Sequence, residues 1–548
     1  MNANNHPASR FWLWLFLAAG LSTALGLYVH RLMTYGDNLD YLFIAWKTCS
    51  GDWLHPFHWR FPAGYPYLLA GWLWLTGQPT GGDLFLLTPA TVHVAKVFSL
   101  IWLFPSLAVI WGWLRQVKSP ALPYVALLLA TSQSLMLRFS IIGSEPVFIF
   151  CSIAALWLWE RACQTDRPAR FIWIGAAGLT FAATQMRQIG LALPVAVLGY
   201  SLVSWRKHSS AWRRQVWIAA LIPLILALLL LAATNPAHLL DVGRSSQPAS
   251  RHFAILDNLA AGFSFYGMAM PDVVAGKVFG PTGILQCMGG STLELPLVGA
   301  MYVILLAGIL CIFRDPNRPG RLSVLYVAAS IMILLVFPGR EYRYWPPMLP
   351  ILLFLIVSGI QQLLTCRTPR LGRYLPVLLL AWIGFQATTD AFATQKNMRF
   401  AWNLRDRPPW APERYEPSGE LDFAGILDAG EWLGSHSPAN SVSVSSKALF
   451  VQISSRRPTK YPQQIDDAIR QSQTLNIPLY LVIDAFSDSA GYGRAKATYL
   501  LPLIQQNPGR FALVYESRYL QTRVYRCDPG TPLTAIPAGT ASGTPRSP

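Results

Sequence analysis

The sequence predicts a polytopic α-helical membrane protein with a soluble α/β domain at its C-terminal end. Of the 548 residues, 53% are hydrophobic and only 13% are charged, and the mean hydropathy is +0.34. A soluble domain carries about a quarter charged residues, so this composition indicates a chain that crosses a membrane. The net charge of +17 arises from basic residues between apolar stretches. Membrane proteins place basic residues there, so the charge indicates no nucleic-acid partner.

About eleven apolar stretches approach the length of roughly 20 residues that a helix needs to cross a bilayer. We interpret the first, which follows Arg10, as an uncleaved span, because no small-residue cleavage site stands out. The fifth and sixth are short and adjacent, and Arg187 lies between them. The predicted spans lie near residues 11–30, 89–114, 120–137, 146–163, 170–185, 188–204, 214–234, 295–313, 322–338, 344–365 and 374–390.

Arg and Lys residues gather in every second loop, and the positive-inside rule assigns those loops to the cytoplasm. We therefore expect a multi-pass protein of a bacterial inner (plasma) membrane, with a cytoplasmic N-terminus and a periplasmic or extracellular C-terminal domain. The first long outer loop runs from about residue 31 to 88. In it, residues 41–47 are expected to form an interfacial helix. Residues 67–75 are apolar but too short to span, and are expected to be interfacial or re-entrant.

The chain divides by composition into a membrane domain at 1–392, a Pro-rich linker at 393–417, a soluble domain at 418–528 and a disordered tail at 529–548. Strand and helix patterns alternate in the soluble domain, which is typical of a layered α/β structure. We expect its helices at 421–433, 465–472 and 495–506, and its strands at 441–445, 479–483, 511–515 and 522–526.

The seven Cys residues include no C-x-x-C pair, so the sequence predicts neither a metal cluster nor a disulfide framework. One bridge among Cys49, Cys287 and Cys527 stays open. A basic stretch in the soluble domain comprises Ser446-Lys447, Arg456-Arg457 and Lys460-Tyr461. We expect a solvated face there, with contact to an acceptor or glycan as the alternative.

Two acids follow the first span closely. If the segment is helical, the spacing of three places Asp37 and Asp40 on one face. One carboxylate could then act as a general base, while the other tunes it or holds a metal. The alternative is that both acids are simply solvated.

Arginines lie at the predicted outer ends of the spans. A buried Arg187 needs an anionic partner, either an acid of the protein or a phosphate, which the planar guanidinium suits. Arg340, Arg343 and Tyr344 precede a span, where an interfacial anchor is the alternative to substrate binding. Arg138 and Glu145 flank a turn and could pair with each other or contact substrate. All of these groups face one compartment together with the acids, which indicates an active site on that face.

These segments resemble the polytopic glycosyltransferases of the GT-C fold, near the protein O-mannosyltransferase (family 39) and aminoarabinose transferase-like group. Asp37-Asn38-Leu39-Asp40-Tyr41 is similar to the acidic motif Asp-Glu-x-x-Tyr in the first outer loop of that group. Pro62-Ala63-Gly64-Tyr65-Pro66 resembles its Pro-rich segment. Later segments are also similar, namely Ser144-Glu145-Pro146, Met186-Arg187-Gln188 and Arg343-Tyr344-Trp345-Pro346-Pro347.

The resemblance implies inverting transfer of a sugar, a hexose or pentose, from a polyprenyl-phosphate donor to a hydroxyl of a glycan, lipid or protein. It places Asp37 at the catalytic base and Tyr41 at the conserved aromatic of the motif. It also implies that Arg187, Arg340 and Arg343 stabilise the departing lipid phosphate. Asn38 stands where the group often has Glu. The second acid is then Asp40, and a divalent metal stays unassigned.

The alternative function is a transporter or flippase for a lipid-linked or anionic substrate. Such a protein should carry ionisable residues near the middle of its spans. Most of the predicted spans lack them, and the attached soluble domain also favours an enzyme. A non-catalytic relative in a glycan assembly complex is a third interpretation.

Overall fold

The computed structural model describes most of the chain and divides into two compact units. Unit 1 comprises Met1–Tyr28, Leu54–Leu68 and Lys96–Met398, and unit 2 comprises Val29–Trp53, Leu69–Ala95 and Arg399–Pro548. The described residues are 7–28, 37–52, 62–78, 85, 87–165, 168–205, 207–234, 259–260, 262–267, 270–271, 273–274, 291–315, 319–336, 344–367, 370–416, 421–484 and 496–529.

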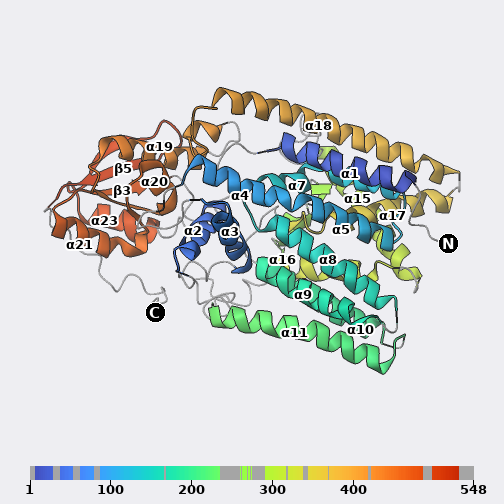
Figure 1. Ribbon diagram of the computed structural model, residues 1–548. Coiled ribbons are helices and arrows are strands. Elements are labelled where there is room, and N and C mark those ends of the chain that lie inside the picture. Colours follow the sequence, from blue (N-terminus) through green and yellow to red (C-terminus); the bar gives the residue numbers. More distant parts are fainter. Residues whose placement is uncertain are drawn as a thin grey trace. The chain divides into compact units, whose positions relative to one another are not determined.

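Unit 1 is a bundle of helices (Figure 1). A helix or a pair of helices occupies each of the predicted spans. The helices are α1 (Pro7–Gly26), α4 (Pro89–Ile101, shared with unit 2), α5 (Leu103–Gln116), α6 (Leu122–Ala130), α7 (Gln133–Met136), α8 (Glu145–Cys163), α9 (Arg170–Met186), α10 (Ala192–Val203), α11 (Ser210–Thr234), α15 (Ser291–Arg314), α16 (Arg321–Val336), α17 (Leu349–Arg367) and α18 (Leu375–Asn403).

Fewer of these helices can cross a membrane alone than the sequence predicted. Six of the described helices are long and apolar enough, or seven if α6 and its continuation to Ser140, bent by 57°, form one span. The helices at Gln188–Val203 and Arg321–Leu335 are apolar but short. Apolar composition alone could not reveal where a turn interrupts a helix. The predicted fold class, a polytopic helical protein with a soluble α/β domain, is confirmed at this coarser level.

The central helix of unit 1 is α8, which packs against α5, α9, α10 and α16. Its side chains are buried on nearly every face. By contrast, α11, α15 and α18 expose large apolar side chains such as Leu229, Leu306 and Val377. Exposed apolar stripes on long helices match a lipid environment, so these three helices form lipid-facing sides of unit 1.

A buried carboxylate links α8 to the start of α16. Glu160 accepts hydrogen bonds from the backbone N–H of Gly320 (3.2 Å) and from the N–H and hydroxyl of Ser323 (3.1 and 2.9 Å). The indole of Trp113 on α5 donates to the same hydroxyl (3.3 Å). The first N–H groups of a helix have no partner within the helix. Glu160 therefore caps α16 from a neighbouring helix.

Replacing Glu160 with Ala should lower the free energy of unfolding by about 2 to 3 kcal/mol, because buried donors at α16 lose their acceptor. Chemical unfolding in mixed micelles measures the loss. Glu160→Gln keeps one acceptor oxygen and should lose less. Equal stability of the Ala variant and the unchanged protein would contradict this role of Glu160.

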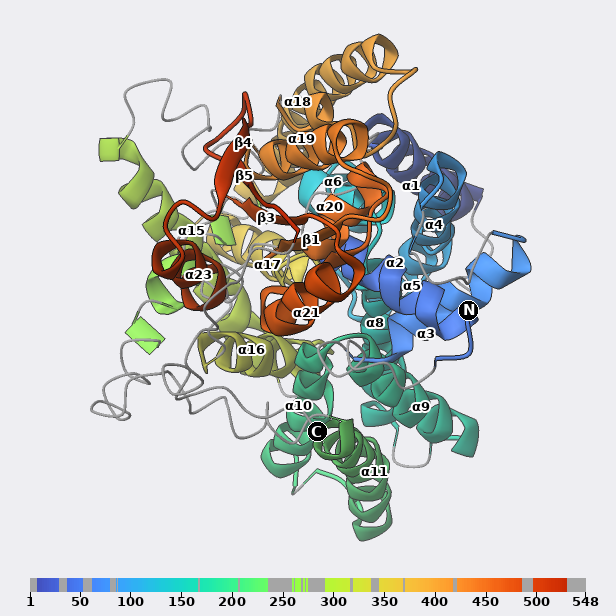
Figure 2. The same cartoon turned by 90° about the vertical axis from the view of Figure 1, so that its left-hand side faces the viewer.

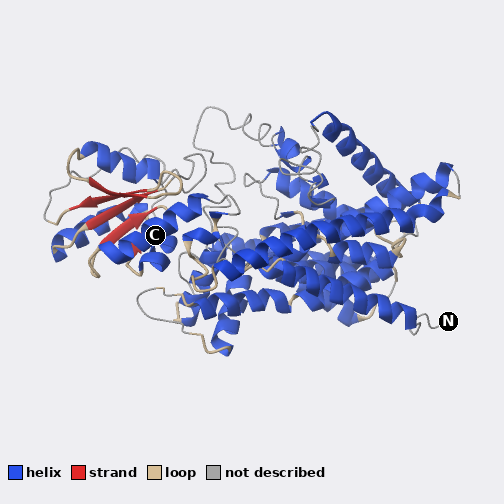
Figure 3. Cartoon of the chain, turned by 90° about the horizontal axis from the view of Figure 1, so that it is seen from above, coloured by secondary structure: helices blue, strands red, loops and turns tan. Residues whose placement is uncertain are grey.

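Unit 2 contains a five-stranded sheet with helices on both faces (Figures 2 and 3). The strand order is β2-β1-β3-β5-β4, where β1 runs parallel to β2 and β3, and β5 runs antiparallel to β3 and β4. The elements are α19 (Leu421–His436), β1 (Val442–Ser445), α20 (Ala448–Ser455), β2 (Thr459–Lys460), α21 (Ile465–Leu475), β3 (Leu479–Ile483), α23 (Leu501–Gln506), β4 (Ala512–Glu516) and β5 (Arg523–Cys527).

Every strand and helix expected in the soluble domain is present, but α20 and β2 were missed. The sequence of α20, ALFVQISS, is short and apolar without a clear helical period, and β2 has only two residues. The expected solvated face is wrong at Ser446 and Lys447, which are buried. Further along the same stretch, Arg456 is exposed, and Arg457, Lys460 and Tyr461 are half-buried. Cys49 and Cys527 do not form a disulfide with each other, and Cys287 lies outside the described residues.

Most of the expected linker at 393–417 is structured. Its first part continues α18 to Asn403. Beyond it, the buried guanidinium of Arg414 donates to the carbonyls of Leu404, Arg407 (2.7 Å) and Pro408 (2.9 Å). Arg407 in turn forms ion pairs with Glu413 (3.2 Å) and with Glu431 of α19 (3.0 Å). Polar, Pro-rich composition suggested a linker because it does not reveal such side-chain contacts to the main chain.

Candidate functional site

A buried ion pair lies where α8 begins and α9 ends. Arg187 follows α9 in an extended conformation, and Glu145 is the first residue of α8. The Nη2 atom of Arg187 is 2.6 Å from Oε1 of Glu145, and its Nε donates to the hydroxyl of Ser144 (2.9 Å). The two charged side chains are only 8% and 2% exposed. The sequence predicted either an acid of the protein or a phosphate as the partner of Arg187, and the structure shows the acid, Glu145.

Glycines allow three separate segments to meet at this pair. A Cβ on Gly143 would collide with the Glu145 carboxylate. The N–H of Gly143 donates to the hydroxyl of Tyr65 (3.0 Å), which is fully buried. A Cβ on Gly64 would lie 2.8 Å from the carbonyl oxygen of Gln185. The Pro-rich segment, the turn before α8 and the end of α9 therefore pack together, although they lie far apart in the sequence.

Tyr344 covers the other side of the arginine. The Cζ atom of Arg187 lies 5.3 Å from the centre of the Tyr344 ring, within the range of a cation–π contact. The next residue, Trp345, is buried. Arg340 and Arg343 lie outside the described residues, so the structure brings only Tyr344 of that predicted cluster to Arg187.

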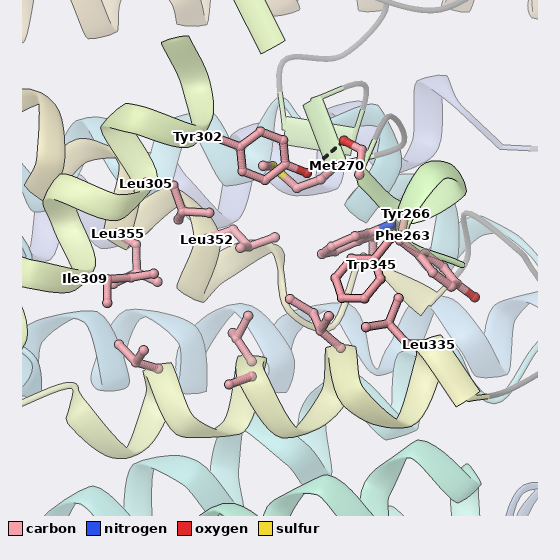
Figure 4. A pocket seen from close by; sticks show the side chains of 15 residues that line it. Phe263, Tyr266, Met270, Tyr302, Leu305, Ile309, Leu335, Trp345, Leu352 and Leu355 are labelled. Carbon is pink, nitrogen blue, oxygen red and sulfur yellow. Dashed lines mark hydrogen bonds between the residues drawn. The ribbon is translucent and has the colours of Figure 1, made fainter. Parts of the chain in front are cut away.

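An apolar cavity of about 270 Å³ lies beside Trp345, between α15, α16, α17 and the segment around Tyr266 (Figure 4). Trp345, Tyr266 and Phe263 lie toward one end of it, and Ile309 and Leu355 toward the other. The lining also includes Gly267, Met270, Tyr302, Leu305, Val324, Val327, Ala328, Ile331, Leu335 and Leu352. The hydroxyl of Tyr302 donates to the carbonyl of Gly267 (2.8 Å), so this polar atom has a partner.

The wall near Leu355 is formed by a close crossing of α15 and α17. A Cβ on Gly308 would collide with the carbonyl of Leu355, and one on Gly359 with the carbonyl of Ile304. The two main chains are therefore in direct contact at this crossing. The cavity has no signal in the sequence, and of its lining residues only Trp345 lies in one of the motifs described above.

The predicted acids lie on a helix, as the spacing argument required. Helix α2 runs from Asp37 to Cys49, and Asp40 is 4% exposed. Asn38 and Tyr41 are also buried, whereas the side chain of Asp37 lies outside the described residues. Helix α2 belongs to unit 2, and the Arg187–Glu145 pair belongs to unit 1.

Arg138 is buried in the turn Leu137–Ser140 that precedes α8. The sequence left open whether Arg138 pairs with Glu145 or contacts substrate. In the structure, Glu145 forms an ion pair with Arg187. Among the described residues, no three or more His, Cys, Asp or Glu side chains are grouped so that they could hold a metal ion.

Glu145→Ala should cost about 3 to 5 kcal/mol of unfolding free energy, because Arg187 would stay buried without its anion. The double variant Glu145→Gln/Arg187→Met removes both charges and should regain most of that loss. Chemical unfolding in mixed micelles compares them. Removing the half-exposed Arg407 in Arg407→Ala should cost at most about 1 kcal/mol and serves as the control. A double variant no more stable than Glu145→Ala would refute the assignment.

No protein-family model and no curated protein matches the chain. Several solved structures match the chain in fold. ArnT from Cupriavidus metallidurans in the apo state is 14% identical, with 95% of this chain and 98% of that chain covered and a TM-score of 0.54. The ArnT structure bound to undecaprenyl phosphate is also 14% identical. The match covers 94% of this chain and 98% of that chain, with a TM-score of 0.51.

The archaeal oligosaccharyltransferase AglB from Archaeoglobus fulgidus, in complex with an inhibitory peptide and a dolichol-phosphate, is also similar. It is 14% identical, with 92% of this chain and 73% of that chain covered and a TM-score of 0.50. At this identity the likeness establishes the fold and not the activity. The chain therefore has the GT-C fold that ArnT and AglB share, and the resemblance expected from the sequence is confirmed for the fold.

Proposed function

We propose that the chain is an integral-membrane inverting glycosyltransferase that moves a sugar from a polyprenyl-phosphate donor to an acceptor hydroxyl. The observation that carries the proposal is the arrangement around Arg187. A buried guanidinium lies under Tyr344, and the next residue, Trp345, lines an apolar cavity. A cation linked to an apolar cavity through the neighbouring residues Tyr344 and Trp345 suits a ligand with an anionic head and a hydrocarbon tail.

Arg187 keeps the capacity to bind a phosphate. Its hydrogen bonds to Ser144 and Glu145 use two of the five N–H donors of a guanidinium. The remaining donors suit phosphate oxygens. We assign Arg340 and Arg343 to the same phosphate, because they shortly precede Tyr344 in the chain. Donors placed at a developing charge lower the barrier for departure of the leaving group.

We assign the general base to Asp37 and a tuning role to Asp40. The Asp37 carboxylate takes the proton of the acceptor hydroxyl as the acceptor oxygen attacks the anomeric carbon. The bond from that carbon to the phosphate oxygen breaks, and the polyprenyl phosphate leaves with the electron pair. Attack from the opposite side inverts the anomeric configuration. We assign Tyr41 and Arg138 to contacts with the substrates.

Two solved structures with the same fold support this donor class. ArnT has been solved with undecaprenyl phosphate and AglB with a dolichol-phosphate. The distribution of Arg and Lys favours a cytoplasmic N-terminus and a soluble domain on the outer side of a bacterial plasma membrane. The acceptor would be a glycan, lipid or protein that reaches that face.

Asp37→Asn should lower the rate of transfer by about 10²- to 10⁴-fold, the usual contribution of a general base, while donor binding persists. Arg187→Met should lower the rate of transfer and also weaken donor binding. The assay supplies a panel of polyprenyl-phosphate sugars to protein in liposomes and measures the release of free polyprenyl phosphate. Asp52→Asn, an exposed Asp just after α2, is the matched control and should leave the rate unchanged.

Unchanged release in the Asp37→Asn variant would exclude the proposed base. Movement of a labelled lipid across the bilayer without any glycosyl product, in the unchanged protein, would instead favour the transporter or flippase.

A further inference from the structure

Three aromatic rings that the catalytic proposal does not use form a cluster at helix α2. Two of them, Phe43 and Trp46, lie one turn apart on α2, and their rings are nearly parallel (6.2 Å between centres, 23°). The third, Phe85, comes from the segment before α4. We propose that Phe85 is a positioning residue that fixes the orientation of α2 and thereby places the proposed base. This inference rests on the proposed function.

Phe85 contacts both rings of α2 in edge geometry. Its ring centre is 5.3 Å from that of Phe43 at 81°, and 5.5 Å from that of Trp46 at 62°. Edge-to-face pairs have a preferred direction and are worth more than their buried area alone. Phe85 is only 1% exposed, so its ring has little room to move. One side chain from another segment therefore restrains rotation of α2 about its axis.

Lys47 packs on the same two rings within α2, and Cys49 at the C-terminal end forms a hydrogen bond to another segment. The ammonium of Lys47 lies 5.2 Å from the Trp46 ring centre and 5.9 Å from that of Phe43. The thiol of Cys49 donates to the carbonyl of Ala70 (3.3 Å) on α3 (Gly64–Leu75).

The surroundings of α2 are themselves tied together within unit 2. The indole of Trp72 on α3 donates to the carbonyl of Val94 (2.9 Å) on α4. Helix α2 also packs against α20 of the sheet domain. The aromatic contacts at Phe85 lie between the first turn, where Asp37 and Asp40 lie, and the hydrogen bond of Cys49 at the C-terminal end.

Small movements of α2 matter because a general base must reach one particular proton. A displacement of about 1 Å can cost roughly 100-fold in rate without loss of binding. Asp40 precedes Phe43 by one turn, so a change in the packing of the Phe43 ring turns or tilts the turn that carries the acids. A smaller residue at position 85 should therefore lower kcat and leave the KM for the donor unchanged.

The test compares Phe85→Leu and Phe85→Tyr with Phe511→Leu, which removes a buried ring from the core beside the sheet. All are assayed as full-length protein in liposomes, with kcat, donor KM and the folded fraction measured for each. We expect Phe85→Leu to lower kcat about tenfold or more at unchanged KM. Phe85→Tyr keeps the ring and should stay within about threefold of the original rate. Phe511→Leu should change the melting temperature but not kcat per folded molecule.

Loss of activity in Phe85→Leu that only follows the folded fraction, or that Phe511→Leu reproduces, would overturn the positioning role. Asp37→Asn measured in parallel separates the two proposals. An inactive Asp37→Asn with a fully active Phe85→Leu overturns this inference alone. An active Asp37→Asn overturns both, since no base on α2 would then need to be positioned.

Discussion

Burial of the Arg187 guanidinium is the constraint on which the packing between the end of α9 and the start of α8 depends. A charge in such a place must have an anion close by, and Glu145 supplies it at 2.6 Å. Bringing the two together requires the end of α9 and the start of α8 to meet closely. Positions 64 and 143 are occupied by glycine because the neighbouring segments leave no space there for a side chain. The pair thus organises the same turns that carry the similarity to GT-C enzymes.

The pairing also changes how Arg187 is to be understood. A lone buried cation would attract any anion, whereas a cation already neutralised by Glu145 offers only its remaining directional N–H donors. Such a group favours a ligand whose oxygens match the geometry of the guanidinium over one that is merely negative. Tyr344 limits the approach from one face. Selectivity for a phosphate would then come from geometry more than from net charge.

Much of the fold could be predicted because the signals were local. Strand β3 is a continuous apolar run, and its bounds agree with the prediction residue by residue. A helix was expected at residues 41–47, and α2 (Asp37–Cys49) contains that range. The misses have different causes. Arg414 donates to carbonyls only six to ten residues earlier, but composition does not show which side chain bonds to the main chain. The burial of Lys447, whose ammonium lies over the ring of Phe423, depends on contact with a residue distant in sequence. The cavity beside Trp345 was hidden for the same reason, since its walls come from several separate segments.

The crossing of α15 and α17 has a consequence for redesign. Gly308 and Gly359 contact the main chain of the opposite helix, so substituting side chains cannot widen the cavity at this point. Enlarging the cavity would require a smaller side chain at Leu305 or Ile309, or at Trp345 at the aromatic end. Adding even a methyl group at either glycine would spread the two helices apart and alter the whole chamber at once.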